Sequence, residues 1–204
     1  MVARAKYNVL VTGTSSYGVG EGLLKVINKS KYRNEIKLLG ASNSNLTAFK
    51  NIIDEYYVLP NAFENDYLDE LIKVLKKESI DILIPGSEAE MGVLSKNKDM
   101  INEITDIWVN DYPIIELFND KLKTNDFLNK YDFNTPKLYD KQIEKLSFPV
   151  IAKPVFGKGS ESIYVVNNTQ QLKAVKKMYA AYNKEFIIQE YLDRKSTRLN
   201  SSHP

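Results

Sequence analysis

The feature that most constrains the fold is the regular succession of short apolar runs and helical stripes in the first half of the chain. Apolar runs of strand length lie at 8–12, 36–40, 56–59, 80–84 and 107–109. Apolar residues with helical spacing lie between several of these runs, at Leu23, Leu24 and Ile27 and again at Leu68, Leu71, Ile72 and Leu75. Because strands that alternate with helices pair in parallel, the pattern predicts a β-α-β-α-β-α-β order and an open parallel sheet with helices on both faces.

A glycine-rich turn, GTSSYGVGEG from Gly13 to Gly22, joins the first expected strand to the first expected helix. Its spacing differs from the G-x-G-x-x-G of dinucleotide sites. The next strand run is followed by Ala41, Ser42 and Asn43 rather than by the acidic residue that would hold a ribose. Both observations argue against an NAD-dependent oxidoreductase, and the glycines are expected to serve a tight turn and close helix packing.

A serine and a glutamate follow the strand run at 80–84, after Pro85 and Gly86 end it. Ser87 and Glu90 have the S-x-x-E spacing of a capping box, in which each side chain satisfies a backbone N–H at the start of a helix. Ligands of α/β folds also bind at the carboxyl ends of strands. The sequence therefore favours capping at this position and leaves substrate contact as the alternative.

The stretch FPVIAKPVFGKGS, Phe148 to Ser160, combines a strand, a lysine and a glycine loop. Alternation along the strand predicts one apolar face with Phe148, Val150 and Ala152, and places Lys153 on the other. Glycines let a backbone approach a ligand closely, and an ammonium beside them suits a phosphate. The stretch therefore fits either a phosphate-binding hairpin or an ordinary hairpin whose lysine extends to water. It matches neither a P-loop nor the glycine loop of a protein kinase.

The second half of the chain contains two further expected helices and a last strand. One helix is expected to begin at Asn119, with that residue as its cap. Lys121 would then lie in the first turn, where a positive charge is unfavourable unless an anion binds there. The other helix should bury Leu172, Val175, Tyr179 and Tyr182, and a strand should follow at 185–192.

Composition excludes several kinds of function. The chain has no cysteine, and its one histidine is His203, so thiolate chemistry and histidine-based triads or metal sites are excluded. The apolar run near the N-terminus is too short for a signal peptide, and no run is long enough to span a membrane, which predicts a cytoplasmic protein.

The final segment, 193–204, is polar, lacks periodicity and resembles the translation of a sequencing adapter, so we expect a non-native tail. It contains three of the 28 basic residues and one of the 26 acidic residues, and the rest of the chain is therefore neutral. A neutral chain gives no indication of a nucleic-acid or membrane partner.

Four strings occur in order in the second half: NDKLKT from Asn119, FPVIAKP from Phe148, FGKGS from Phe156 and IIQEYL from Ile187. Together they resemble the first half of an ATP-grasp domain, closest to that of the carbamoyl-phosphate synthase large subunit. The N-terminal region resembles the pre-ATP-grasp domain of that family. The resemblance implies an α/β fold with a Rossmann-like pre-ATP-grasp domain at 1–112, an incomplete small α+β ATP-grasp subdomain at 113–192 and the tail at 193–204.

The resemblance also implies an activity: ATP phosphorylates a small-molecule carboxylate, and an amine attacks the resulting acyl phosphate. Lys121 and Lys153 would hold the phosphates, and a lid over them would consist of Gly157, Lys158, Gly159 and Ser160. Gln189 and Leu192 would meet adenine through their backbone groups, with Glu190 beside the adenine pocket. No catalytic side chain is identified, because positioning and charge neutralisation suffice for phosphoryl transfer.

In this family the Mg²⁺ ligands and much of the acceptor site lie in the second half of the ATP-grasp fold, beyond Leu192. We therefore expect a truncated chain that contains no metal ligand and cannot turn over ATP. The acceptor substrate and the oligomeric state are not indicated by the sequence. A noncatalytic nucleotide-sensing or partner-binding α/β module is the alternative function.

Overall fold

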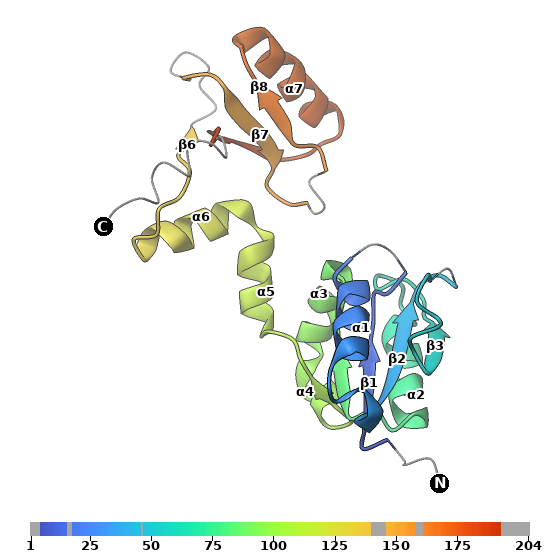
Figure 1. Cartoon of the computed structure of the whole chain (residues 1–204). Helices are drawn as coiled ribbons and strands as arrows, with labels where there is room; N and C mark the ends of the chain where they lie inside the picture. Colours follow the sequence, from blue (N-terminus) through green and yellow to red (C-terminus); the bar gives the residue numbers. More distant parts are fainter. Residues whose placement is uncertain (1–4, 16–17, 46, 140–145, 158–160, 193–204) are drawn as a thin grey trace. The chain divides into compact units, whose positions relative to one another are not determined.

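The structure is a computed structural model in which the chain divides into two compact units, Met1–Ile115 and Glu116–Pro204 (Figure 1). We call them the N-terminal unit and the C-terminal unit and describe each by itself. The structure describes residues 5–15, 18–45, 47–139, 146–157 and 161–192.

The N-terminal unit is built on a five-stranded sheet with the order β3-β2-β1-β4-β5, and every neighbouring pair is parallel. The strands are β1 (Tyr7–Val11), β2 (Ile36–Ser42), β3 (Glu55–Val58), β4 (Ile82–Ile84) and β5 (Asp106–Ile107). The prediction of an open parallel sheet is therefore confirmed. The chain leaves the central strand β1 first toward β2 and later toward β4, so the carboxyl ends of β1 and β4 flank a switch point in the topology.

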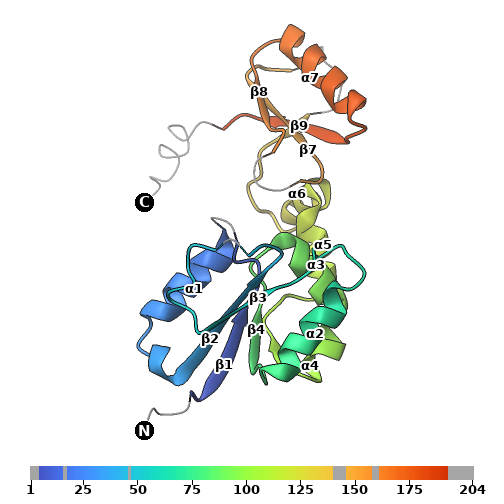
Figure 2. The same ribbon diagram turned by 90° about the vertical axis from the view of Figure 1, so that its right-hand side faces the viewer.

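Helices cover both faces of this sheet, as Figure 2 shows. The helices are α1 (Val19–Lys29), α2 (Tyr67–Lys77), α3 (Glu88–Lys96) and α4 (Lys98–Asn102), with a short 3-10 turn, η1, at Arg33–Glu35. Leu24 of α1 packs with Val11 and Leu38 on one face, while Leu71 of α2 packs with Leu10 and other residues on the opposite face. Two apolar clusters, one on each face, thus enclose the strands.

Two sequence predictions about this unit need correction. The strictly alternating order is wrong, because the described residues between β2 and β3, 43–45 and 47–54, form turns and bends rather than a helix. In α2 the buried side chains are Tyr67, Leu71, Val74 and Leu75. The helix is rotated slightly from the predicted stripe, since Tyr67 and Val74 also pack into the core.

The C-terminal unit contains a four-stranded antiparallel sheet with the order β6-β9-β7-β8. Its elements are α5 (Tyr112–Asn119, which begins before the unit boundary), α6 (Lys121–Lys130), β6 (Leu138–Tyr139), β7 (Val150–Pro154), β8 (Tyr164–Val166), α7 (Thr169–Ala181) and β9 (Phe186–Glu190). Helix α7 packs Leu172, Val175 and Tyr179 on the face of the sheet that carries Val150 and Ala152.

Two helix-end predictions in this unit are wrong. Asn119 is the last residue of α5 rather than the cap of the next helix, and Asp120 caps α6 instead. The Asp120 carboxylate accepts hydrogen bonds from the backbone N–H groups of Leu122 at 2.9 Å and Lys123 at 3.1 Å. Tyr182 lies just past the end of α7 and is 73% exposed, so it is not part of the buried stripe. Within the described ranges, no helix has the length and apolarity needed to cross a bilayer.

Candidate functional site

Strand β7 presents Lys153 on the face of the sheet away from α7. Val150 and Ala152 are fully buried in the core beneath α7, whereas Ile151 and Lys153 are only partly buried. This is the alternation that the sequence predicted for Phe148–Lys153. In the register, Lys153 is paired with Ile187, and Ile151 with Gln189. Because paired residues point to the same face, Lys153 and Gln189 share one face of the sheet.

Lys121, the first residue of α6, lies at the end of β7. Its backbone N–H donates to the Val155 carbonyl at 3.2 Å, and its ammonium donates to the carbonyls of Val155 at 3.3 Å and Gly157 at 3.0 Å. These bonds hold the side chain against the segment that leads from Lys153 into the glycine loop. The tertiary structure thus brings together two lysines that are far apart in the sequence.

The two ammonium groups form a local excess of positive charge. Burial, and secondarily the positive charge of Lys121, lower the pKa of the Lys153 ammonium from its usual value. Within the part of the chain that the structure describes, neither lysine forms an ion pair with an acidic side chain. An anion bound beside both lysines would relieve this repulsion, so the arrangement fits a phosphate group.

Gly157 begins the glycine loop with a backbone conformation that disfavours other residues. Its φ is +149°, and a Cβ there would lie 3.4 Å from Cγ of Pro154. The backbone geometry therefore requires glycine where the chain turns away from β7. The other three predicted loop residues, Lys158, Gly159 and Ser160, lie outside the described residues.

The predicted adenine-side residues lie on β9 and just beyond it. Gln189 is buried, and Leu192, past the end of the strand, is 45% exposed. Glu190 holds Lys137, the residue before the edge strand β6. Its backbone N–H donates to the Lys137 carbonyl at 2.8 Å, and its carboxylate accepts from the Lys137 N–H at 3.2 Å. The register pairs Glu190 with Val150, which places it on the face opposite Lys153. Of the two predicted adenine-side residues on β9, Gln189 and Glu190, Gln189 therefore shares the lysine face.

The glycine-rich turn of the N-terminal unit is close-packed against the β4–α3 connection. A Cβ on Gly86 would lie 2.3 Å from the Thr12 carbonyl oxygen and 2.5 Å from Cα of Gly20. A Cβ on Gly20 would lie 2.5 Å from the carbonyl oxygen of Gly13. The space between these segments is filled by backbone, which confirms the prediction of a tight turn and close helix packing.

Ser87 and Glu90 form the predicted cap of α3. The Ser87 hydroxyl accepts from the Glu90 N–H at 3.3 Å and donates to the Glu90 carboxylate at 2.7 Å. The Tyr67 hydroxyl donates to the other carboxylate oxygen at 3.2 Å. Glu90 is 6% exposed, and burial raises the pKa of its carboxyl group. Ser87 is thus confirmed as the N-cap of α3. The Glu90 carboxylate bonds to the Ser87 and Tyr67 hydroxyl groups, rather than to the N-cap backbone as in a complete capping box, and ties α2 to α3.

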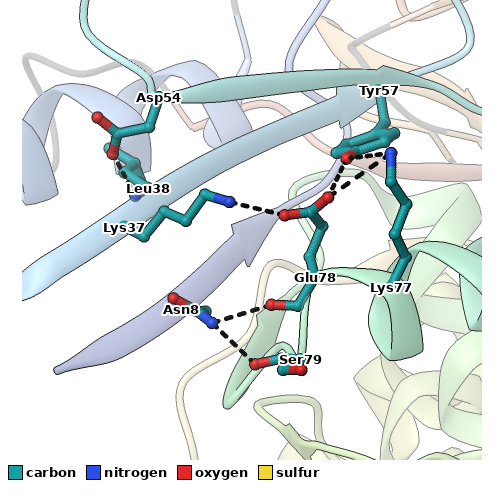
Figure 3. Close-up of polar contacts among 8 residues, drawn as sticks. All are labelled: Asn8, Lys37, Leu38, Asp54, Tyr57, Lys77, Glu78 and Ser79. Carbon is teal, nitrogen blue, oxygen red and sulfur yellow. Dashed lines mark hydrogen bonds and ion pairs between the residues drawn. The ribbon is translucent and has the colours of Figure 1, made fainter. Parts of the chain in front are cut away.

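A second polar cluster of the N-terminal unit centres on Glu78, as Figure 3 shows. The carboxylate of Glu78 accepts from the Lys37 ammonium at 2.7 Å and from the Tyr57 hydroxyl, and the Lys77 ammonium donates to that hydroxyl at 3.1 Å. Hydrogen bonds from Lys37 and then from Tyr57 lower the pKa of Glu78. No sequence motif predicts this cluster, because its members are up to 41 residues apart.

A hollow of about 1080 Å³ in the N-terminal unit lies at the amino ends of β1 and β2 and is lined in part by Lys37, Arg33 and Asp54. These three charges are paired: Arg33 with Asp54 at 3.1 Å, and Lys37 with Glu78. The carboxyl ends of the strands, where ligands of such sheets bind, are at the opposite edge. We therefore assign the candidate site to the lysine pair of the C-terminal unit rather than to this hollow.

Two protein-family models match the chain, one within each structural unit. Residues 13–107 match the sequence model of the PylC-like N-terminal domain, and residues 118–200 match that of the ATP-grasp domain. The second match continues past Leu192 into the segment at 193–200. No curated protein matches the sequence significantly.

Solved structures with a similar fold are ATP-grasp enzymes. N5-carboxyaminoimidazole synthetase from Staphylococcus aureus, complexed with ADP, has a TM-score of 0.68 and 18% identity over 94% of this chain and 49% of its own. The corresponding enzyme from Thermotoga maritima has a TM-score of 0.59 and 20% identity over 92% of this chain and 46% of its own. Biotin carboxylase from Campylobacter jejuni has a TM-score of 0.63 and 14% identity over 93% and 46%.

The chain thus consists of a region that matches the PylC-like N-terminal domain followed by a region that matches the ATP-grasp domain, in a fold similar to that of N5-carboxyaminoimidazole synthetase. The predicted fold class and the ATP-grasp resemblance are confirmed. The closer likeness to carbamoyl-phosphate synthase stays a prediction. This chain spans about half the length of the solved structures that it matches.

Proposed function

We propose that this chain supplies the phosphate-binding part of an ATP-dependent carboxylate–amine ligase. The observation that carries the proposal is the lysine pair: Lys121 and Lys153 place two ammonium groups at one end of β7, and burial, with a further contribution from the charge of Lys121, lowers the pKa of Lys153. Two like charges held together this way are stabilised by a polyanion. A nucleotide triphosphate has the required charge.

The residues around the lysine pair support a nucleotide rather than a simple anion. Gly157 has a backbone that only glycine adopts readily, which lets the chain approach a phosphate closely. Gln189 lies on the same face of the sheet as Lys153. We assign the phosphates to the two lysines and to the loop of Gly157, Lys158, Gly159 and Ser160, and the adenine edge to the backbone of Gln189 and Leu192, with Glu190 beside the pocket.

The proposed reaction needs no protein nucleophile. The carboxylate oxygen of one substrate attacks the γ-phosphorus of ATP, ADP leaves, and an acyl phosphate forms. The nitrogen of an amine then attacks the acyl carbon, phosphate leaves, and an amide-type bond results. Lys121 and Lys153 contribute by neutralising charge on the phosphates and by fixing them in line with the carboxylate.

Magnesium would supply further charge neutralisation on the phosphates in such a reaction. In the described part of the chain, no cluster of three or more acidic or histidine side chains could hold a metal ion. We assign no step of the reaction to a metal held by these residues. We propose that the metal ligands and the acceptor site belong to sequence beyond this chain, which spans 49% or less of these structural neighbours. We also propose that the 204 residues bind ATP without turning it over.

Calorimetric titration of the 204-residue chain with ATP, ADP and NADH tests the binding proposal. We expect ATP and ADP to bind and NADH to bind more weakly. A preference for NADH would contradict the proposal and favour the oxidoreductase. Carboxylate-dependent formation of ADP by this chain alone would contradict the second part of the proposal.

An activity assay separates the ligase from a noncatalytic nucleotide-sensing or partner-binding module. A longer protein that includes the coding sequence downstream of this chain should form ADP in a reaction that depends on both a carboxylate and an amine. If the longer protein binds ATP but never forms ADP with any pair of such substrates, the noncatalytic module is the better description.

A further inference from the structure

Tyr179 occupies the centre of the apolar core between α7 and the sheet. It is 2% exposed, and its ring stacks on Phe186 with centroids 4.7 Å apart and meets the edge of Tyr164 at 5.9 Å. Aromatic contacts on two sides fix the orientation of the ring. The position of its hydroxyl group is therefore determined by the core.

The hydroxyl of Tyr179 lies within reach of two backbone carbonyls on the arms of the β7–β8 hairpin. It donates to the carbonyl oxygen of Ala152 at 3.1 Å and also to that of Ser162. The Ala152 carbonyl belongs to the peptide bond that leads directly into Lys153. One buried side chain thus holds the peptide of the phosphate-binding lysine and the start of the returning arm.

The Ser162 contact joins the hydroxyl to a backbone position of unusual conformation. Ser162 has a φ of +58°, in the left-handed region that non-glycine residues adopt at a cost. Such a conformation persists when surrounding contacts hold it, and the bond from Tyr179 is one such contact. Burial, with a smaller contribution from Tyr164, raises the pKa of the Tyr179 hydroxyl to about 12, so the group remains a donor at neutral pH.

We propose that the Tyr179 hydroxyl is a positioning residue for the phosphate site, because it fixes the Ala152–Lys153 peptide and thereby the direction of the Lys153 ammonium. The inference rests on the proposed function and extends it to a residue on the opposite side of the sheet. The alternative is a tyrosine that only fills the core. A phenylalanine would fill the core equally well, which makes the two roles separable.

The expected effect is moderate. Ser162, Tyr164 and Tyr179 line part of a cavity of about 270 Å³ beside the hydroxyl, so water could enter the space left by its removal and bond to one of the carbonyls. Tyr179→Phe should therefore weaken ADP binding by about fivefold, less than the loss of the lysine itself, in keeping with the modest net value of one hydrogen bond.

The experiment is a double-mutant cycle in the full chain, with ADP affinity measured for wild type, Tyr179→Phe, Lys153→Ala and the double variant. Positioning through Lys153 predicts that Tyr179→Phe changes ADP affinity in the wild type and leaves it unchanged in the Lys153→Ala background. Tyr182→Phe is the matched control, since Tyr182 is 73% exposed next to the same helix, and it should bind ADP like wild type.

Each outcome decides between the roles. Equal losses in both backgrounds, or a Tyr179→Phe protein that binds ADP like wild type, would overturn the positioning role and leave the proposed function intact. A wild-type chain that does not bind ADP would overturn the proposed function and this inference with it. If the Tyr179→Phe protein does not fold, Ser162→Gly is added to all four proteins of the cycle. Glycine adopts a positive φ without cost, so this change removes the backbone strain at position 162.

Discussion

The two units of this protein differ in how the charged side chains of their main polar clusters are paired. In the N-terminal unit, Lys37, Tyr57 and Glu78 form a closed cluster in which positive and negative groups pair at hydrogen-bond distance. In the C-terminal unit, Lys121 and Lys153 are held near one another as like charges, and burial, together with the charge of Lys121, lowers the pKa of Lys153. The first arrangement stabilises a fold, whereas the second leaves a local positive charge that a bound anion would neutralise.

The glycines of the two units also differ in what requires them. Gly86 and Gly20 lie where a side chain would collide with backbone, so they serve packing in the N-terminal unit. For Gly157, the Pro154 ring is the one group of the described residues within 4 Å of a Cβ, and the positive φ is the reason for glycine. A glycine-rich stretch therefore indicates a ligand site only when the space beside the glycines is free.

The largest expected effect tests the packed glycines. Gly86→Ala should destabilise the N-terminal unit by about 3 kcal/mol, because its Cβ would meet the Thr12 carbonyl oxygen at 2.3 Å and neither backbone segment can move easily. Urea unfolding followed by the fluorescence of Trp108, the only tryptophan, measures this unit. Gly92→Ala in α3 is the control, since a Cβ there meets nothing within 4 Å; alanine should be neutral or stabilise the helix. A stable Gly86→Ala protein would show that the turn is not close-packed.

Removing one lysine of the pair should affect binding rather than folding. Lys153→Ala should weaken ADP binding by about ten- to a hundredfold, because a charge-assisted bond to phosphate is lost. Calorimetry gives the affinity, and Lys173→Ala, an exposed lysine on α7, is the control. Unchanged ADP affinity in Lys153→Ala would mean that the lysine only extends to water, as in an ordinary hairpin.

Breaking the closed cluster should affect folding rather than binding. Glu78→Gln should destabilise the N-terminal unit by about 1.5 kcal/mol, since Glu78 is the charged acceptor of two hydrogen bonds. Its pKa is lowered in the folded chain, so its contribution is present above the ordinary value of 4.5 and is lost as the pH falls through the lower folded value. Urea unfolding between pH 6 and 3 should therefore show a weaker acid dependence in Glu78→Gln, with Glu64→Gln as an exposed control. An identical acid dependence in wild type and Glu78→Gln would contradict this role.

The smallest expected effect is the pH dependence of binding. The lowered pKa of Lys153 means that the free protein begins to lose this charge at a lower pH than an ordinary lysine does, and a bound phosphate favours the charged form. ADP affinity should therefore fall by about two- to threefold between pH 7.5 and 9.5. Lys121→Ala should move this dependence to higher pH, because one cause of the lowered pKa is gone. A Lys121→Ala protein with an unchanged pH profile would show that the two lysines do not interact.

Much of the fold was predictable because it depends on local patterns. The apolar runs of the N-terminal region gave the parallel sheet, and the alternation from Phe148 to Lys153 placed the lysine on the correct face. One error concerns a whole element, because the described residues between β2 and β3 form turns and bends where a helix was expected. The other errors fell at element ends: Asp120 rather than Asn119 caps α6, and Tyr182 lies outside the α7 stripe. The competing caps Asn119 and Asp120 are adjacent, and only the path of the backbone decides between them.

The sequence by itself determined the succession of strands in the parallel sheet, the packed glycine turn, the cap at Ser87 and the string that contains Lys153. The tertiary structure alone decided which distant groups meet. Lys121 reaches the Gly157 carbonyl across 36 residues, and Tyr179 reaches the Ala152 carbonyl across 27. Periodicity encodes which face of an element is buried, but sheet register and helix packing decide which side chains lie opposite one another, and these arise from contacts along the whole unit.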